Sequence, residues 1–208
     1  TFSKQDKWLR FLPNNYHQFN QQDGEFQAMK SIGDSNILFL FDNAAYSSQQ
    51  DQGILTTEGV IYTGTGSIFE RRLRKISIES NGLGGCIDKY SIVNTPFGTY
   101  WLDRLRKTFI MFNGQGIEKI DTNMRSWFNE WLDKPVHGHY DPYTQNIYWS
   151  SEDWTISYKP EIKQFVSFHD FIPQKYLKQN YTFLSLKGDI WKHNIKNHYQ
   201  TYYGKTYP

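Results

Sequence analysis

Two histidines on one short segment are the residues best suited to metal chemistry. His137 and His139 lie two residues apart, so on a β-strand their side chains point to the same side, and Asp141 follows closely. A protein metal site needs at least a third ligand, and none can be nominated here. The pair His193 and His198 is spaced wrongly for one helical face. We therefore expect a solvent-facing strand end at 137–141 and no metal site.

Two glycine-rich segments resemble phosphate-binding loops in composition only. They are Thr63–Ser67 and Asn81–Gly85. A phosphate loop lies between a strand and a helix N-terminus and is followed by Lys-Ser/Thr or by a distant acidic residue. Neither segment has this context. We predict that both are turns and that the chain binds no cofactor.

The acidic residues do not form a recognisable catalytic pair. Ser151–Thr155 has a distant likeness to the Asp-box turns of sialidase propellers, but it lacks the glycine and the residue order of that motif. Glycoside hydrolysis requires two carboxyl groups roughly 5–10 Å apart across a bound sugar. A chance pair among 21 acidic residues proves nothing. We predict no catalytic residues and a protein that is not an enzyme.

Two basic clusters lie at or beside predicted turns. Their members are Arg71, Arg72, Arg74 and Lys75, and Arg104, Arg106 and Lys107. Most such clusters only face solvent. In a particle that handles DNA they would offer weak, sequence-independent phosphate contacts along a conduit. These seven residues are therefore the candidates for contact with a channel or a partner.

Composition indicates one soluble, strand-rich unit. The 208 residues include 15 Tyr, 15 Phe and 7 Trp, which favours pleated, half-buried surfaces. The net charge is +2, too balanced to imply nucleic-acid binding by the whole chain, although residues 171–208 are basic. Cys86 is the only cysteine, so no intrachain disulfide forms. No window is apolar enough for a membrane helix.

Residues 91–121 predict a four-stranded meander. The expected strands are Ser91–Val93, Thr99–Leu102, Thr108–Phe112 and Gly116–Ile120. The turn residues Thr95–Gly98 separate the first two. Asn113-Gly114 is a strong signal for a type I′ hairpin, in which both central residues need positive φ.

The same pattern recurs from Val136 to Phe171. Its expected strands are Val136–Tyr140, Asn146–Trp149, Trp154–Tyr158 and Gln164–His169. Strict alternation in the third strand predicts that Trp154, Ile156 and Tyr158 share a buried face and that Thr155, Ser157 and Lys159 share a wetter one.

Further elements extend this pattern. A partial unit at Tyr181–Asn194 has a hairpin turn at Lys187-Gly188, and Ile37–Phe41 is apolar on both faces, as in a central strand. A short helix is predicted between the two full units, with N-cap candidates at Asp121–Asn123, apolar residues up to Trp131 and an end at Pro135.

The expected fold is all-β, a partial β-propeller of four-stranded antiparallel blades with one short inter-blade helix. The spacing of the units fits the roughly 35–50 residues of a propeller blade. A β-sandwich is the alternative. We expect an irregular or peripheral segment at 1–54, with one central strand at 37–41, and an incomplete propeller at 55–208, with blades at about 91–121 and 136–171 and a partial blade at 181–208. Because closure needs more blades, we expect a fragment whose segment 199–207 pairs with a strand outside it.

Several motifs carry a resemblance to a known family. They are Phe112–Ile117, Asp141–Tyr143, Trp154–Tyr158, Phe165–Phe168 and Tyr203–Lys205. At these positions, and over residues 55–208, the chain resembles propeller domains of tail nozzle or hub proteins of short-tailed bacteriophages, most closely the muzzle proteins of crAss-like phages. These motifs are structural rather than catalytic.

The resemblance implies a virion structural protein of the phage tail, made in the host bacterial cytoplasm. It implies a homo-oligomeric ring that contacts other tail proteins, encloses the DNA exit channel, touches DNA transiently and helps to gate ejection. The alternative is a bacterial propeller that binds or cleaves glycans, because exposed Trp and Tyr can stack on sugars.

Overall fold

The structure is a computed structural model, and it describes residues 16–32, 36–49, 54–56, 59–61, 73–77, 84–120, 123–177, 182–195 and 201–206. Most elements are strands, and all the strand pairs in these residues are antiparallel. The predicted all-β class is confirmed.

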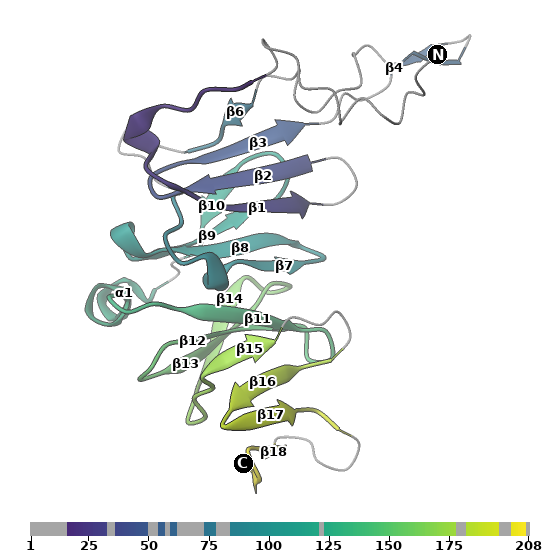
Figure 1. Cartoon of the computed structure of the whole chain (residues 1–208). Coiled ribbons are helices and arrows are strands. Elements are labelled where there is room, and N and C mark those ends of the chain that lie inside the picture. Colours follow the sequence, from purple (N-terminus) through teal and green to yellow (C-terminus); the bar gives the residue numbers. More distant parts are fainter. Residues whose placement is uncertain are drawn as a thin grey trace.

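Four sheets follow one another in chain order (Figure 1). The first has the order β1-β2-β3-β6, at Phe26–Ile32, Asn36–Phe41, Ala45–Gln49 and Arg74–Lys75. The second has the order β7-β8-β9-β10, at Val93–Thr95, Gly98–Asp103, Thr108–Phe112 and Ile117–Lys119. The third has the order β11-β12-β13-β14, at His137–Asp141, Asn146–Ser150, Thr155–Lys159 and Gln164–His169. The fourth has the order β15-β16-β17, at Lys175–Leu177, Leu184–Lys187 and Asp189–Lys192.

The remaining elements are small. Two hairpins are formed by β4 and β5 (Ile54–Thr56 and Gly59–Ile61) and by β18 and β19 (Thr201–Tyr202 and Lys205–Thr206). The helix α1 spans Arg125–Trp131, and short 3₁₀ helices lie at η2 (Gln21–Asp23), η4 (Lys89–Ser91) and η5 (Arg104–Arg106). Among the described residues no helix has the length and apolar character that crossing a membrane requires.

The two predicted meanders are confirmed, as is the central position of Ile37–Phe41, which lies in β2 between β1 and β3. The neighbouring strands β1, β3 and β6 and the short strand β15 were not predicted. The Lys187-Gly188 turn is also confirmed, because Lys187 pairs with Asp189 and Gly188 has a φ of 72°.

The predicted two-residue turn at Asn113-Gly114 is wrong. Phe112 pairs with Ile117, so four residues connect β9 to β10. Gly114 has a φ of 93°, but Asn113 does not adopt a positive φ. Instead, the Asn113 side-chain oxygen accepts hydrogen bonds from the backbone N–H groups of Gln115 (2.9 Å) and Gly116 (3.1 Å). This Asx-type turn uses the same residues in a longer loop.

Successive sheets pack face to face, because alternate side chains of the central strands enter different cores. Tyr100 and Phe109 of the second sheet face the third sheet, where they join Trp149 and Tyr158. Trp101 faces the first sheet instead. The opposite face of the third sheet packs on the fourth in a separate aromatic cluster, formed by Tyr148, Phe171, Tyr176, Phe183 and Tyr202. Four sheets in series, rather than two, distinguish this arrangement from a sandwich.

The predicted wetter face of β13 is wrong. Thr155 and Ser157 are fully buried, like Ile156 on the other face. The Thr155 hydroxyl donates to the Phe171 carbonyl at 2.6 Å, and the Ser157 hydroxyl lies 2.9 Å from the His169 ring nitrogen. Small hydroxyl groups can be buried when they are hydrogen-bonded. The alternation of polar and apolar residues in β13 therefore indicates a buried, hydrogen-bonded polar layer here, not a face exposed to solvent.

The first strand in chain order of each sheet, which is β1, β7, β11 or β15, lies beside the first strand of the next sheet. Strand β11 contacts both β7 and β15, and the Asn94 side chain on β7 donates to the Ser31 carbonyl on β1 (3.3 Å). Between β7 and β11 a methyl group on Gly138 would lie 2.6 Å from ring atoms of Trp149 and from Cγ2 of Val93. The second and third sheets therefore approach closely at their first strands.

The same interface is wide near the fourth strands, where α1 fills it. The Phe128 ring lies 5.5 Å from Phe109 on β9 and 5.4 Å from Phe165 on β14. Trp127 contacts Trp154 and Phe168. A gap that is narrow at one edge and wide at the other is what radial packing of sheets requires. The described sheets do not close into a ring.

The predicted short helix between the two meanders is confirmed, but its N-cap is not. Asp121 and Thr122 lie outside the described residues, and Asn123 has a φ of 59°. Met124 is the N-cap residue and makes no side-chain capping bond. The helix is held by packing of Phe128, which is fully buried.

We predict that Trp154→Ala lowers the free energy of unfolding by about 3–5 kcal/mol. The indole is only 7% exposed, packs 5.0 Å from Trp127 and donates to the Trp131 carbonyl (3.2 Å). Urea unfolding followed by circular dichroism measures the change. Trp191→Ala, at a partly buried indole on β17, is the control and should cost less. Equal losses for the two variants would contradict the packing described.

Candidate functional site

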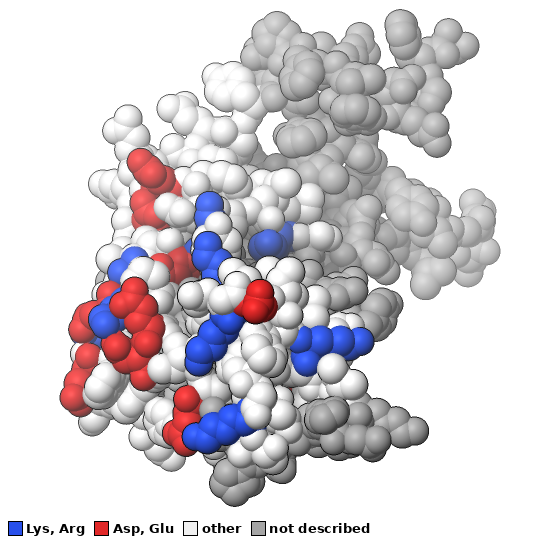
Figure 2. All heavy atoms as spheres, turned by 60° about the horizontal axis from the view of Figure 1, so that its bottom comes forward, with Lys and Arg blue, Asp and Glu red and all other residues white. Residues whose placement is uncertain are grey.

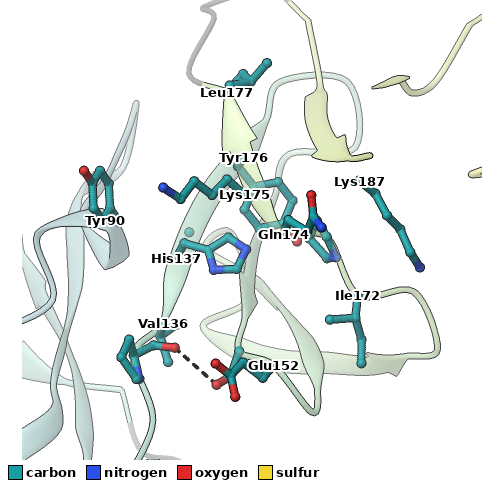
Figure 3. A pocket seen from close by; sticks show the side chains of 14 residues that line it. Tyr90, Val136, His137, Glu152, Ile172, Gln174, Lys175, Tyr176, Leu177 and Lys187 are labelled. Atoms are coloured by element: carbon teal, nitrogen blue, oxygen red, sulfur yellow. Dashed lines mark hydrogen bonds between the residues drawn. The ribbon is translucent and has the colours of Figure 1, made fainter. Parts of the chain in front are cut away.

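A groove of about 760 Å³ opens where segments of successive sheets meet (Figure 3). Three of its walls are formed by segments at the start of the first strands. These are Tyr90 in η4, which precedes β7, residues 135–138, where β11 begins, and residues 172–177, which lead into and form β15. The connection between β12 and β13 and the end of β16 complete it. The groove therefore lies at one end of the row of first strands.

Proline shapes two of these walls. Pro135 and Pro173 each lie two residues before a first strand. Proline cannot donate to a strand ladder and fixes its own φ, so it stiffens the entry to each strand. The groove walls are thus set by backbone geometry as well as by packing.

The polar groups of the groove are suited to binding. Lys175 and Lys89 extend their ammonium groups over the Tyr90 ring, 5.6 and 5.3 Å from its centroid. The close-up shows the His137 ring between the Lys175 and Gln174 side chains (Figure 3). Burial lowers the pKa of His137, and a hydrogen bond with the Pro173 backbone opposes this. A neutral imidazole is therefore favoured at physiological pH.

The basic residues predicted to contact a channel or a partner are divided between two sheets. Arg74 and Lys75 form β6 at the edge of the first sheet, whereas Arg104, Arg106 and Lys107 lie in and after η5, between β8 and β9 of the second. Arg71 and Arg72 lie outside the described residues.

Most of these cations contact carboxylates within the chain. The Lys75 ammonium lies 2.5 Å from an Asp23 oxygen, and Lys107 lies 2.7 Å from Asp133. Arg104 contacts Asp88 at 2.9 Å. Burial raises the pKa of the Asp88 carboxyl, and the Arg104 guanidinium opposes this. The Arg104–Asp88 pair ties η5 to the connection that enters β7.

A second ion pair anchors the other end of η5. Arg106 lies 3.4 Å from Asp103, whose carboxylate also accepts from the Gly84 backbone N–H (3.0 Å). Burial raises the pKa of Asp103.

The charged side chains are distributed unevenly over the face that lies at the bottom of Figure 1. Figure 2 shows this face with basic side chains spread across it and acidic side chains mostly gathered at one side.

The two histidines of the 137–141 segment face aromatic rings. His139 is 4% exposed and stacks against both Tyr176 (5.7 Å) and Phe183 (5.1 Å). The described residues contain no group of three potential ligands that could hold a metal ion. The expected solvent-facing strand end is wrong, because the fourth sheet covers this part of β11.

The glycine-rich segments fall partly outside the described residues, which omit Thr63–Ser67 and residues 81–83. Gly84 lies in a turn with a φ of 109°, and a methyl group on Gly85 would lie 2.0 Å from the Asp42 carbonyl oxygen. Gly85 permits a close backbone approach to the β2–β3 turn of the first sheet. The Asp-box-like connection contains Glu152 and Asp153, and both contact Lys134.

One pair has the residue types of a nucleophile and a base. The Ser185 hydroxyl lies 2.7 Å from His193 Nε2 and 2.7 Å from the Tyr203 hydroxyl. Ser185 is fully buried and His193 is 4% exposed, so no substrate can approach them. The network joins the fourth sheet to the β18–β19 hairpin.

Comparison with known proteins identifies one family. The family model described as Crassvirus muzzle protein matches residues 3–189. The muzzle protein of Bacteroides phage crAss001 is 24% identical over 204 residues, which cover 91% of this chain and 14% of that protein. The chain thus spans about a seventh of the length of this relative.

We predict that stability falls as the pH drops below about 6.5. Burial lowers the pKa of His193 to about 4 and also lowers that of His137 and His169. Between pH 6.5 and 4 the unfolded chain therefore binds more protons than the folded one at His193, which favours unfolding by roughly 1.4 kcal/mol per pH unit. His137 and His169 act in the same direction.

Urea unfolding at pH 7.5, 6.0 and 4.5 tests this. His193→Phe should reduce the pH dependence, whereas Tyr203→Phe, which removes the other partner of Ser185 and no histidine, should leave it. A pH dependence that is unchanged in His193→Phe would show that His193 does not titrate as described.

Proposed function

Because the chain belongs to the Crassvirus muzzle protein family, we propose that it forms part of a structural wall of the phage tail, built as a segment of a β-propeller. The observation that carries this proposal is the convergence of the first strands, with β11 beside both β7 and β15. Radial sheets around an axis produce this neighbour relation.

The wedge between the second and third sheets supports the same arrangement. Gly138 permits close approach near the first strands, and the α1 side chains fill the wider side. Burial of both faces of the second and third sheets makes these sheets stiff, which suits a wall that must hold its shape against pressure from a packaged genome. We propose that further segments of the longer protein, or neighbouring subunits, complete the ring.

We further propose that this wall helps to enclose and gate the channel for DNA ejection. A conduit must not retain DNA, and tight phosphate binding would slow its passage. The ion pairs of Arg104, Arg106 and Lys107 fit this requirement, because internal carboxylates partly neutralise these cations. Contact with DNA would then be weak and transient.

A structural role is favoured over glycan cleavage. Glu152 and Asp153, in the Asp-box-like connection, both contact Lys134 rather than facing each other across an open site. The buried Ser185–His193 pair is inaccessible. We therefore propose a structural protein without enzymatic activity.

Electron cryomicroscopy of purified particles tests the structural role. We expect density for residues 91–177 at the distal end of the tail, in a symmetric ring, with β7, β11 and β15 toward the axis of the propeller. Absence of the polypeptide from the particle, or saturable binding of a single sugar class by the chain with turnover, would overturn the proposal.

The weak DNA contact gives a separate prediction. Fluorescence anisotropy with a 20-base-pair duplex should give a Kd above about 10 μM at 150 mM salt, within the range of non-specific binding. The double variant Arg74→Gln with Lys107→Gln should weaken binding several-fold at low salt. Lys163→Gln with Lys192→Gln is the charge-matched control and should not. Nanomolar binding at 150 mM salt would contradict a conduit that releases DNA.

A further inference from the structure

We propose that the groove between η4, β11 and β15 binds an extended peptide segment of a neighbouring protein, in which apolar side chains are flanked by Asp or Glu. This inference rests on the residues that line the groove. It does not depend on whether the sheets belong to a closed ring. It assigns a partner-binding surface to residues that sequence analysis had not connected.

The walls of the groove are mainly apolar. Pro135, Val136, Ile172, Pro173 and Leu177 line it, and Tyr176 is buried beside them. A volume of about 760 Å³ lies within the range of sites that hold ligands of several hundred daltons. Apolar side chains of an extended peptide would fill such a groove, whereas a DNA duplex is too wide to enter it.

His137 forms an uncharged part of one groove wall. Its Nε2 atom is inaccessible to solvent, so a ligand in the groove meets the ring rather than this nitrogen. Burial lowers the pKa of His137, and a hydrogen bond with the Pro173 backbone opposes this. The neutral ring adds apolar surface to the wall without adding charge.

The charges favour acidic residues in the ligand. Lys175 and Lys187 line the groove, and Lys89 adjoins it at Tyr90. The carboxylate in the lining, Glu152, lies 3.5 Å from Lys134 outside the groove and is thereby partly neutralised. Positive charge beside an apolar groove attracts carboxylates and raises the association rate.

Tyr90 is suited to be the aromatic anchor of this surface. It is 56% exposed, although two ammonium groups lie over its ring. Tyrosines that present an apolar ring and a polar hydroxyl at a rim are typical of protein-binding sites. Its contacts with Lys89 and Lys175 hold both cations at the mouth of the groove.

Selection from a random peptide library displayed on a carrier tests the inference with the full chain as bait. We expect enriched peptides that combine Asp or Glu with apolar residues. A fluorescein-labelled consensus peptide should bind with a micromolar Kd. Binding should weaken at least tenfold in Lys175→Glu with Lys187→Glu.

The control is Lys163→Glu with Lys192→Glu, which makes the same charge change outside the groove lining and should leave the Kd within twofold of wild type. Circular dichroism confirms folding of each variant. No enrichment of acidic peptides, or equal loss in the control, would overturn the proposal. So would binding of a labelled oligonucleotide in place of peptides, or self-association in sedimentation that the Lys175→Glu with Lys187→Glu variant abolishes, since a second copy would then occupy the groove.

Discussion

Burial of both faces of every central sheet is the constraint on which this structure depends. A sheet whose two faces are both apolar must have a neighbour on each side, so sheets of this composition form a series rather than a pair. Trp101 and Tyr100, adjacent in sequence, enter the cores on opposite sides of the second sheet. Tyr148 and Trp149 do the same in the third. The aromatic surplus of the sequence is therefore used in the layers between sheets.

The shape of these layers sets the position of the groove. Close approach at Gly138 brings the beginnings of successive first strands together, and with them the segments that lead into those strands. Side chains separated by more than 80 residues, such as Tyr90 and Lys175, meet for this reason. The fixed ion pairs of η5 lie in a connection of the same second sheet. The packing of successive sheets thus joins the fold to the surface proposed for partner binding.

Local signals in the sequence predicted much of the central fold. Turn residues such as Pro160 and Gly188 mark the ends of strands in which apolar and polar residues alternate clearly. The four strands of residues 136–171 could be predicted from such signals. Strand β15 was missed because three residues are too few to show an alternation of apolar and polar side chains. Strand β1 was missed because Gln27 and Lys30 interrupt its apolar pattern. Thr155 and Ser157 were misjudged because polarity cannot distinguish a hydrogen-bonded interior from a wet surface.

The groove could not be predicted, since it depends on contacts between distant segments. His137 was considered as a metal ligand and expected to lie at a solvent-facing strand end, but its ring hydrogen-bonds the Pro173 backbone. The basic residues predicted for a channel were identified by charge alone. Their carboxylate partners, such as Asp88 for Arg104, appear only when the connections fold against each other.

A double-mutant cycle of Gly138→Ala and Val93→Ala tests the convergence of first strands most directly. A methyl group at 138 would lie 2.6 Å from Cγ2 of Val93 and from the Trp149 ring. We expect Gly138→Ala to lower the free energy of unfolding by about 1–3 kcal/mol. We expect a smaller loss in the Val93→Ala background, with a coupling of at least about 0.5 kcal/mol. A neutral Gly138→Ala, or strictly additive losses, would show that β7 and β11 do not approach each other as described.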